Sequence, residues 1–368
     1  MAELRRRALA VARRVDERFD AFRFGLKRRL GLLDPFEILP YRGYGTSREL
    51  FLRGRVLEEA GITRAGRDDA VWKNILNMAR RFASDEVAGA RVMASFEGLQ
   101  VETTADVEGF FEVRFQLAEP LEGPGGWHQV GLEVLSPPSP GGGRVRSKGH
   151  VLVPHGARFG VISDLDDTVI RSSATNVLKM AWIVVRNNAH TRLPFEGVAA
   201  FYRALQLGLD SKSSNPVFYV SSSPWNIYDM LVDFLNVHGV PHGPLFLKDW
   251  SLSVLGKHRD YKIGVIRGLL STYENLPFVL IGDSGGEDPE IYLQAVREHQ
   301  GRIKAVYIRD VTSVERDAEV RAMADEARKL GTEMVAVPDT TAAAEHASSI
   351  GLIAPNAIAA VRSESAGF

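Results

Sequence analysis

The feature that most constrains the fold is a series of short, wholly apolar segments that alternate with helical patterns from Phe159 onward. Such segments are typical of buried strands in a parallel sheet, because helices cover both faces of that sheet. The predicted strands are residues 160–163, 217–220, 278–281, 303–308 and 334–337. We therefore predict an α/β fold, with a Rossmann-like, doubly wound domain over residues 155–368.

Residues 36–154 follow a different rhythm, in which short runs rich in Val, Phe and Leu are separated by turn signals. This pattern predicts a small β-sandwich over residues 36–154, interrupted by one helix at about residues 68–82. A stretch rich in Pro and Gly, residues 137–143, predicts an exposed loop close to the domain boundary. The runs that read as strands are residues 49–57, 91–97, 99–103, 109–117 and 127–135.

The first 35 residues predict a basic amphipathic helix. Apolar side chains recur every three or four positions from Leu4 to Leu33, and Asp34-Pro35 ends the pattern. Residues 1–33 hold ten basic and four acidic side chains, whereas the whole chain has a formal net charge of -1. Such a helix can lie on an anionic membrane surface or dock on the protein's own body, and the sequence leaves both open.

Composition excludes several classes of protein. The chain has no cysteine, which excludes a disulfide scaffold, a thiolate zinc site and a cysteine nucleophile. Its net charge of -1 gives no general attraction to nucleic acid, so no nucleic-acid partner is expected. No apolar run reaches the roughly 20 residues that span a bilayer, and arginines interrupt any secretory signal. We expect a cytoplasmic protein that associates peripherally with membranes.

Polar residues follow three of the predicted strands at their carboxyl ends, which is where open parallel sheets bind ligands. Acidic residues follow the first and third of these strands, a serine follows the second, and a lysine begins the helical pattern before the third. The candidate site residues are Asp164, Asp166, Ser221, Lys262, Asp283 and Asp288.

These residues meet the needs of phosphoryl transfer through a carboxylate. Asp164 can attack phosphorus and form an aspartyl-phosphate intermediate. Asp166 can give a proton to the leaving oxygen and later take one from water. Ser221 and Lys262 supply a hydroxyl donor and a positive charge for the phosphate oxygens.

A cation must offset the repulsion between the attacking carboxylate and the phosphate. Asp164 and Asp283, with or without Asp288 and the backbone carbonyl of Asp166, offer the hard oxygen ligands that Mg²⁺ prefers. We therefore predict Mg²⁺ as the cofactor.

The motif Asp164-Leu165-Asp166-Asp167-Thr168 resembles that of the haloacid dehalogenase superfamily, whose phosphatases use an aspartate nucleophile. More narrowly, the chain is similar to the actin-patch-protein family of phosphatidate phosphatases. The matching stretches are residues 40–46, 161–168, 219–226 and 279–292.

The resemblance implies an enzyme that removes phosphate from phosphatidate with Mg²⁺ and yields diacylglycerol, acting on this or another phosphorylated lipid. It also implies that residues 155–368 form a haloacid-dehalogenase-like phosphatase domain. Where that family has His-Lys before its third-motif helix, this chain has Tyr261-Lys262. Lys248 and Lys257 are alternatives for the lysine. Residues 169–216 are the expected substrate-facing insertion.

Other functions remain open from the sequence. The same mechanism can act on a soluble phosphomonoester or a phosphoprotein. Ser284 lies in a G-x-S-x-G pattern, and Asp310 or Asp339, followed by His346, gives the order that a serine-hydrolase triad needs. The chain can also be a binding protein, with the β-sandwich holding a partner.

Overall fold

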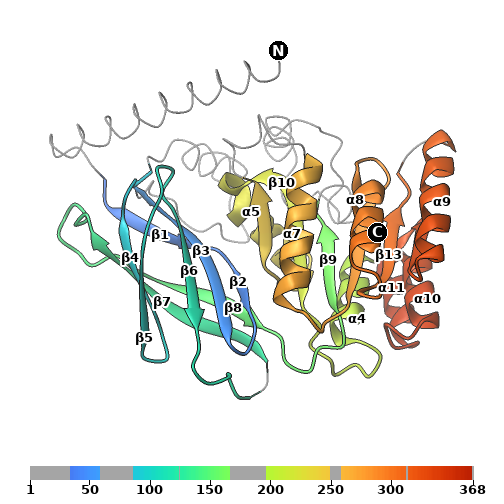
Figure 1. The fold of residues 1–368 in the computed structure, drawn as a ribbon, viewed down its shortest axis with the longest axis horizontal. Helices are drawn as coiled ribbons and strands as arrows, with labels where there is room; N and C mark the ends of the chain where they lie inside the picture. Colours follow the sequence, from blue (N-terminus) through green and yellow to red (C-terminus); the bar gives the residue numbers. More distant parts are fainter. Residues whose placement is uncertain are drawn as a thin grey trace, which may run out of the picture. The chain divides into compact units, whose positions relative to one another are not determined.

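The computed structural model describes residues 34–58, 86–123, 125–165, 196–248, 258–311 and 314–366. Its contacts divide the chain into two compact units, Met1–Val153 and Pro154–Phe368, each of which is described by itself (Figure 1). The helix predicted for residues 1–35 falls almost wholly outside the described residues, and that for residues 68–82 does so entirely.

Eight described strands of the first unit form one mixed sheet (Figure 1). The sheet runs in the order β1-β3-β2-β8-β7-β4-β5, and β6 pairs with β3. Strands β2 and β8 pair in parallel, and the other described pairs are antiparallel. The strands are β1 (Phe36–Pro40), β2 (Gly43–Gly45), β3 (Glu49–Glu58), β4 (Arg91–Phe96), β5 (Leu99–Thr104), β6 (Phe110–Gln116), β7 (Gly126–Ser136) and β8 (Arg146–Val153).

Alternation of apolar and polar side chains builds the core of this unit. In β6, Phe111, Val113 and Phe115 are buried, and the residues between them are exposed. They pack with buried residues from the other strands, such as Leu50 and Val151. A β-rich unit is thus confirmed, and its further arrangement as a sandwich stays a prediction. The sequence missed β1, β2 and β8.

The second unit is built on a six-stranded parallel sheet in the order β11-β10-β9-β12-β13-β14. All five predicted apolar strands are confirmed, and the edge strand β11 was missed. The strands are β9 (Gly160–Asp164), β10 (Val217–Pro224), β11 (Leu245–Lys248), β12 (Phe278–Asp283), β13 (Ile303–Arg309) and β14 (Glu333–Val337).

Helices cover both faces of this sheet, which explains why its strands are apolar throughout. On one face α7, α8 and α9 pack side by side, and Tyr273, directly after α7, contacts Phe218 and Phe278. On the other face α4, α10 and α11 pack together, and Tyr202 of α4 stacks on Tyr219. The helices are α4 (Val198–Leu207), η1 (Trp225–Ile227), α5 (Tyr228–Val237), α7 (His258–Thr272), α8 (Asp288–Glu298), α9 (Val314–Lys329), α10 (Thr340–Ser349) and α11 (Ala357–Ala366).

The order of the strands reverses at β9, the first strand of this sheet in the chain. From β9 the chain builds outward to β10 and β11 on one side, and then returns to build β12, β13 and β14 on the other. Ligands bind where the strand order reverses in this way, so the end of β9 is the expected binding position. No helix among the residues described in either unit is long and apolar enough to cross a membrane.

Gly160 tests the packing of the parallel sheet, because a Cβ at this position would lie 2.4 Å from the ring of the fully buried Phe278. We expect Gly160→Ala to lower the free energy of unfolding by about 1–3 kcal/mol through overpacking. Gly264→Ala on α7 is the matched control, since its Cβ would meet no atom within 4 Å. The control should be stabilising by about 0.5–1 kcal/mol. Equal midpoints of thermal unfolding for the two variants would contradict the packing described here.

Candidate active site

Three buried aspartates meet at the carboxyl ends of β9 and β12. Asp164 ends β9, Asp283 ends the neighbouring strand β12, and Asp288 begins α8 five residues later. The two strands pair with Ile281 opposite Ser163, which sets their ends side by side. Asp164 is 1% exposed and Asp288 is 0% exposed, so solvent screens neither carboxylate.

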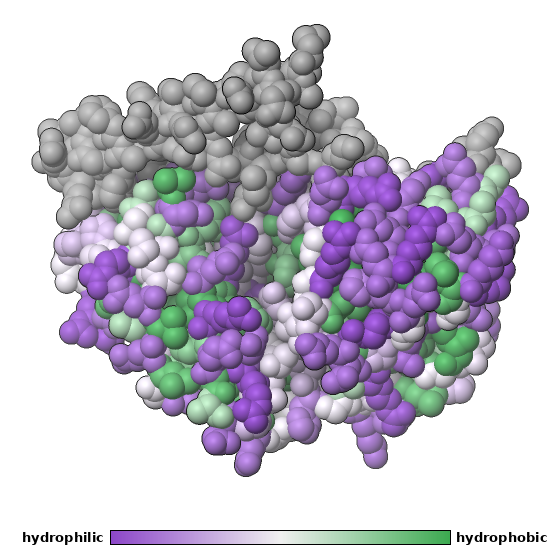
Figure 2. Space-filling model, viewed as in Figure 1, coloured by the Kyte–Doolittle hydropathy of each residue, from purple (hydrophilic) through white to green (hydrophobic). Residues whose placement is uncertain are grey.

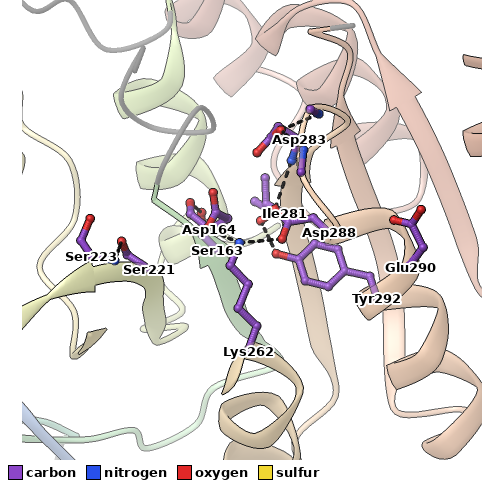
Figure 3. Close-up of polar contacts among 12 residues, drawn as sticks. Ser163, Asp164, Ser221, Ser223, Lys262, Ile281, Asp283, Asp288, Glu290 and Tyr292 are labelled. Atoms are coloured by element: carbon purple, nitrogen blue, oxygen red, sulfur yellow. Dashed lines mark hydrogen bonds and ion pairs between the residues drawn. The ribbon is translucent and has the colours of Figure 1, made fainter. Parts of the chain in front are cut away.

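Lys262 of α7 connects two of these aspartates (Figure 3). Its Nζ lies 2.6 Å from Asp164 Oδ1 and 2.7 Å from Asp288 Oδ1, so one ammonium donates to both carboxylates. Burial alone would lower the pKa of Lys262, but the charges of Asp164 and Asp288 outweigh it and raise that pKa. Lys262 therefore stays protonated and holds the Asp164 carboxylate in place.

Asp283 lies in a tight turn whose backbone N–H groups donate to its carboxylate. Its Oδ1 accepts hydrogen bonds from the backbone N–H groups of Gly285 and Gly286, at 2.7 and 3.1 Å. Burial, together with the charge of Asp288, nevertheless raises the pKa of Asp283 to about 6. A carboxylate in this state favours any cation that enters beside it.

The three carboxylates can hold a metal ion. One oxygen from each of Asp164, Asp283 and Asp288 lies within 4.8 Å of the others, and all three residues are buried. The donor set consists of hard oxygens, which suits a divalent cation such as Mg²⁺. The raised pKa of Asp283 points the same way, because the negative charge gathered here is not balanced by Lys262 alone.

Two residues that the sequence assigned no role shape the position of Asp288. A Cβ on Gly282 would lie 2.5 Å from Asp288 Oδ2 and 2.8 Å from the Tyr292 ring, so only glycine lets the carboxylate lie over β12. Tyr292 is buried, and its hydroxyl donates to the carbonyl oxygen of Ile281 at 2.9 Å. The sequence of the motif alone does not distinguish these positioning roles from ordinary packing.

Arg316 of α9 braces the loop that follows Asp283. Its guanidinium donates to the carbonyl oxygens of Ser284 and Gly286, at 3.1 and 3.0 Å. It also forms a bidentate pair with Glu290 of α8, with contacts of 2.7 and 2.8 Å. The sequence offered no signal for this residue, because a lone arginine on a charged helix is usually solvated.

A buried hydroxyl pair supports the backbone at Asp164. Ser163 Oγ donates to the carbonyl oxygen of Asp164 at 2.6 Å and lies 2.6 Å from the hydroxyl of Tyr202. The single Ser163 proton is used by that carbonyl, so the Tyr202 hydroxyl is the donor to Ser163. This chain links α4 to the strand end that carries the predicted nucleophile.

The structure brings together four of the six predicted site residues. Asp164, Lys262, Asp283 and Asp288 converge, whereas Asp166 lies outside the described residues. Ser221 is buried on β10, where its Oγ accepts from the backbone N–H of Ser223 at 3.0 Å. Figure 3 shows Ser221 on the strand beside Asp164, apart from the aspartates. Its predicted role with phosphate is not tested by these contacts.

The contacts of His346 do not lead to Ser284. His346 Nδ1 lies 3.0 Å from the Tyr307 hydroxyl, and its Nε2 lies 2.6 Å from Glu333. The hydroxyl of Ser284 lies 3.4 Å from Asp310 Oδ1 and accepts from the backbone N–H of Val311 at 3.0 Å. A serine-hydrolase triad would need His346 beside Ser284, and the described contacts place it elsewhere.

Comparison with known families bears out the kinship predicted from the motifs. Residues 159–310 match the family model described as phosphatidate phosphatase APP1, catalytic domain. This segment contains Asp164, Lys262, Asp283 and Asp288.

Two curated relatives each align with this chain over 160 residues, or 42% of its length. Phosphatidate phosphatase APP1 of Saccharomyces cerevisiae is 30% identical, with 26% of its length covered. An uncharacterized protein of Schizosaccharomyces pombe is 25% identical, with 25% covered. The chain thus aligns with about a quarter of each relative's length.

Among solved structures, a carbohydrate acetylesterase from Xanthomonas citri is 12% identical with a TM-score of 0.29. That alignment covers 88% of this chain and 71% of the other. A similarity this weak carries no argument about fold or function.

The raised pKa of Asp283 predicts that this residue destabilises the metal-free protein at neutral pH. Its folded-state pKa of about 6 lies above the usual 3.8. Between these values the folded state binds more protons than the unfolded state, so stability falls as pH rises through this window and stays reduced above it. We expect Asp283→Asn to be more stable than the parent at pH 8 by up to about 3 kcal/mol, with little difference at pH 4.

Thermal unfolding of both proteins in chelator, measured from pH 4 to pH 8, checks this prediction. Asp325→Asn, at an exposed carboxylate on α9, is the control and should change stability by about 0.5 kcal/mol or less at any pH. Added Mg²⁺ should stabilise the parent but not Asp283→Asn. A stability difference that does not grow with pH would contradict the assignment.

Proposed function

Because residues 159–310 carry an APP1-type catalytic domain, we propose that this chain is a Mg²⁺-dependent phosphatidate phosphatase that releases diacylglycerol and phosphate. The observation that carries the proposal is the buried Asp164, fixed by Lys262 at the strand end where the sheet order reverses. The same observation supports a haloacid-dehalogenase-type fold for the second unit. For the whole protein we propose this activity and substrate, a cytoplasmic location and peripheral association with membranes.

In the proposed reaction an Asp164 carboxylate oxygen attacks phosphorus, and the ester bond between phosphorus and the glycerol oxygen breaks. Asp166 gives its proton to that oxygen, so diacylglycerol leaves as a neutral alcohol. Asp166 then takes a proton from water, which attacks the aspartyl phosphate. Phosphate leaves, and the Asp164 carboxylate is regenerated.

The remaining residues manage charge. Lys262 keeps Asp164 oriented, and Ser221 donates to a phosphate oxygen from β10. Asp164, Asp283 and Asp288 would hold Mg²⁺, which would supply positive charge that lowers the repulsion between the carboxylate and the phosphate. Burial of all three aspartates strengthens each of these electrostatic interactions.

Asp164→Asn tests the mechanism, because an amide oxygen is too weak a nucleophile to replace the carboxylate. We expect phosphate release from phosphatidate to fall at least about 1,000-fold, with Mg²⁺ binding and thermal stability measured alongside. Chelator should abolish the activity of the parent. Ser284→Ala is the control and should retain activity, since the mechanism does not use that hydroxyl.

The outcomes separate mechanism from substrate. Activity that survives both Asp164→Asn and chelator, but is lost in Ser284→Ala, would overturn the phosphatase mechanism. Hydrolysis of p-nitrophenyl phosphate without any hydrolysis of phosphatidate would keep the mechanism and favour a soluble phosphomonoester.

We also propose that residues 1–33 place the enzyme on anionic membranes, supported by their excess of ten basic over four acidic side chains. Reversing the charges of Arg5 and Arg6 to Glu should lower binding to vesicles that contain anionic lipid by at least about tenfold, since each basic residue contributes about 1 kcal/mol. The matched control reverses Arg328 and Lys329 on α9. Sedimentation with vesicles measures binding, and p-nitrophenyl phosphate hydrolysis should not change. Equal loss in both variants would refute a specific role for this segment.

A further inference from the structure

We propose that Lys248 is a second phosphate-binding residue of this site and takes the phosphate of a monoester on the side of Asp164 that faces β10 and β11. The inference rests on the proposed function and deepens it, because it names the residue that recognises the phosphate dianion. Lys262 is the first cation of the site, and its ammonium is already occupied by Asp164 and Asp288.

The register of the sheet brings Lys248 to the edge where the aspartates lie. Val220 of β10 is opposite Asp164 of β9 on one side and Phe246 of β11 on the other, so the three residues are level. Lys248 lies two residues beyond that level, at the carboxyl end of β11 and opposite Pro224. Two strand spacings and the offset of two residues together separate its backbone from that of Asp164 by roughly 12 Å, a gap that a lysine stem and a phosphate can share.

Strand alternation puts Lys248 and Asp164 on the same face of the sheet. Phe246 contacts Phe218, and Phe218 contacts Tyr273, which directly follows α7, so this set lies on the face covered by α7. Lys248 is two residues from Phe246 and therefore shares its face. Asp164 also lies on this side, since Lys262 reaches it from α7.

Tyr261 ties the start of α7 to the end of β11. Its hydroxyl donates to the carbonyl oxygen of Leu247 at 2.8 Å, one residue before Lys248. The next residue along α7 is Lys262, which binds Asp164 and Asp288. Two adjacent residues of α7 thus contact the end of β11, which carries Lys248, and the end of β9, which carries Asp164. This accounts for the tyrosine that stands where the similar family has histidine.

Lys248 is an unusual residue for its surroundings, because only 3% of it is exposed. Burial lowers the pKa of Lys248, which reflects the free energy required to keep an ammonium away from water. A phosphate dianion bound at this strand end would offset that desolvation.

Charge balance gives the second cation a purpose. Among the described residues that gather at β9 and β12, three carboxylates face one lysine, and a divalent ion would bring that sum to zero. A phosphomonoester is close to a dianion at pH 7, because its second pKa is about 6. The phosphate therefore needs further positive charge, and Lys248 at the carboxyl end of β11 provides it.

The test compares Lys248→Met with Lys248→Arg, and Lys304→Met serves as the control at an exposed position on β13. Losing one charge-assisted contact to phosphate should weaken binding of inorganic phosphate to the Mg²⁺-loaded full chain roughly 10- to 100-fold. The KM for p-nitrophenyl phosphate should rise by a similar factor, with a smaller change in kcat. Lys248→Arg should retain most of the phosphate affinity, and Lys304→Met should match the parent. Titration calorimetry with phosphate and with Mg²⁺, together with thermal unfolding, gives the needed measurements.

Three results would overturn the inference. Unchanged phosphate affinity in Lys248→Met would remove the role. Loss of Mg²⁺ binding or of the folded state in both Lys248 variants would make the residue a structural support instead. Equal effects in Lys304→Met would show a nonspecific loss of charge. If the parent hydrolyses no phosphomonoester, the proposed function fails, but phosphate binding still decides the role of Lys248.

Discussion

The ion pairs of Lys262 with Asp164 and Asp288 are the interaction on which the second unit's chemistry depends. They join three elements far apart in the chain, β9, α7 and α8, through a single ammonium group. Removing that ammonium would leave two buried carboxylates facing each other without compensation. The parallel sheet provides the frame, since it fixes where β9 and β12 end. Lys262 then holds Asp164 at the end of β9 and Asp288 at the start of α8.

The site carries more negative charge than its own lysine can balance, and the fold tolerates this. Asp283 is stabilised by two backbone N–H groups, yet its pKa stays raised. Such an arrangement stabilises the unit less than a neutral one would, and it favours the binding of a cation beside the three aspartates. The lower stability that the raised pKa of Asp283 implies is thus consistent with ligand binding at this turn.

Much of the second unit could be predicted because buried parallel strands leave a plain signal. The apolar runs at β9, β12 and β13 were confirmed, but β11 is an edge strand of four residues that ends in lysine, and its composition resembles a loop. Asp164, Asp283 and Asp288 could be singled out because each lies at or shortly after the carboxyl end of a predicted strand, where open parallel sheets bind ligands. Gly282 and Arg316 could not, because their effects arise from contacts between elements that the sequence does not place together. In the first unit, β2 has only three residues and carries no periodicity to detect.

The brace supplied by Arg316 has a consequence for how this unit can be divided. The segment shared with the APP1 family ends at residue 310, and Arg316 lies beyond it on α9. The guanidinium nevertheless holds the carbonyl groups of the loop after Asp283. A hybrid protein that received only residues 159–310 would contain Asp164, Asp283 and Asp288. It would lack Arg316, which braces the loop after Asp283. A transferred piece that keeps the loop after Asp283 braced must therefore extend beyond residue 310 into α9.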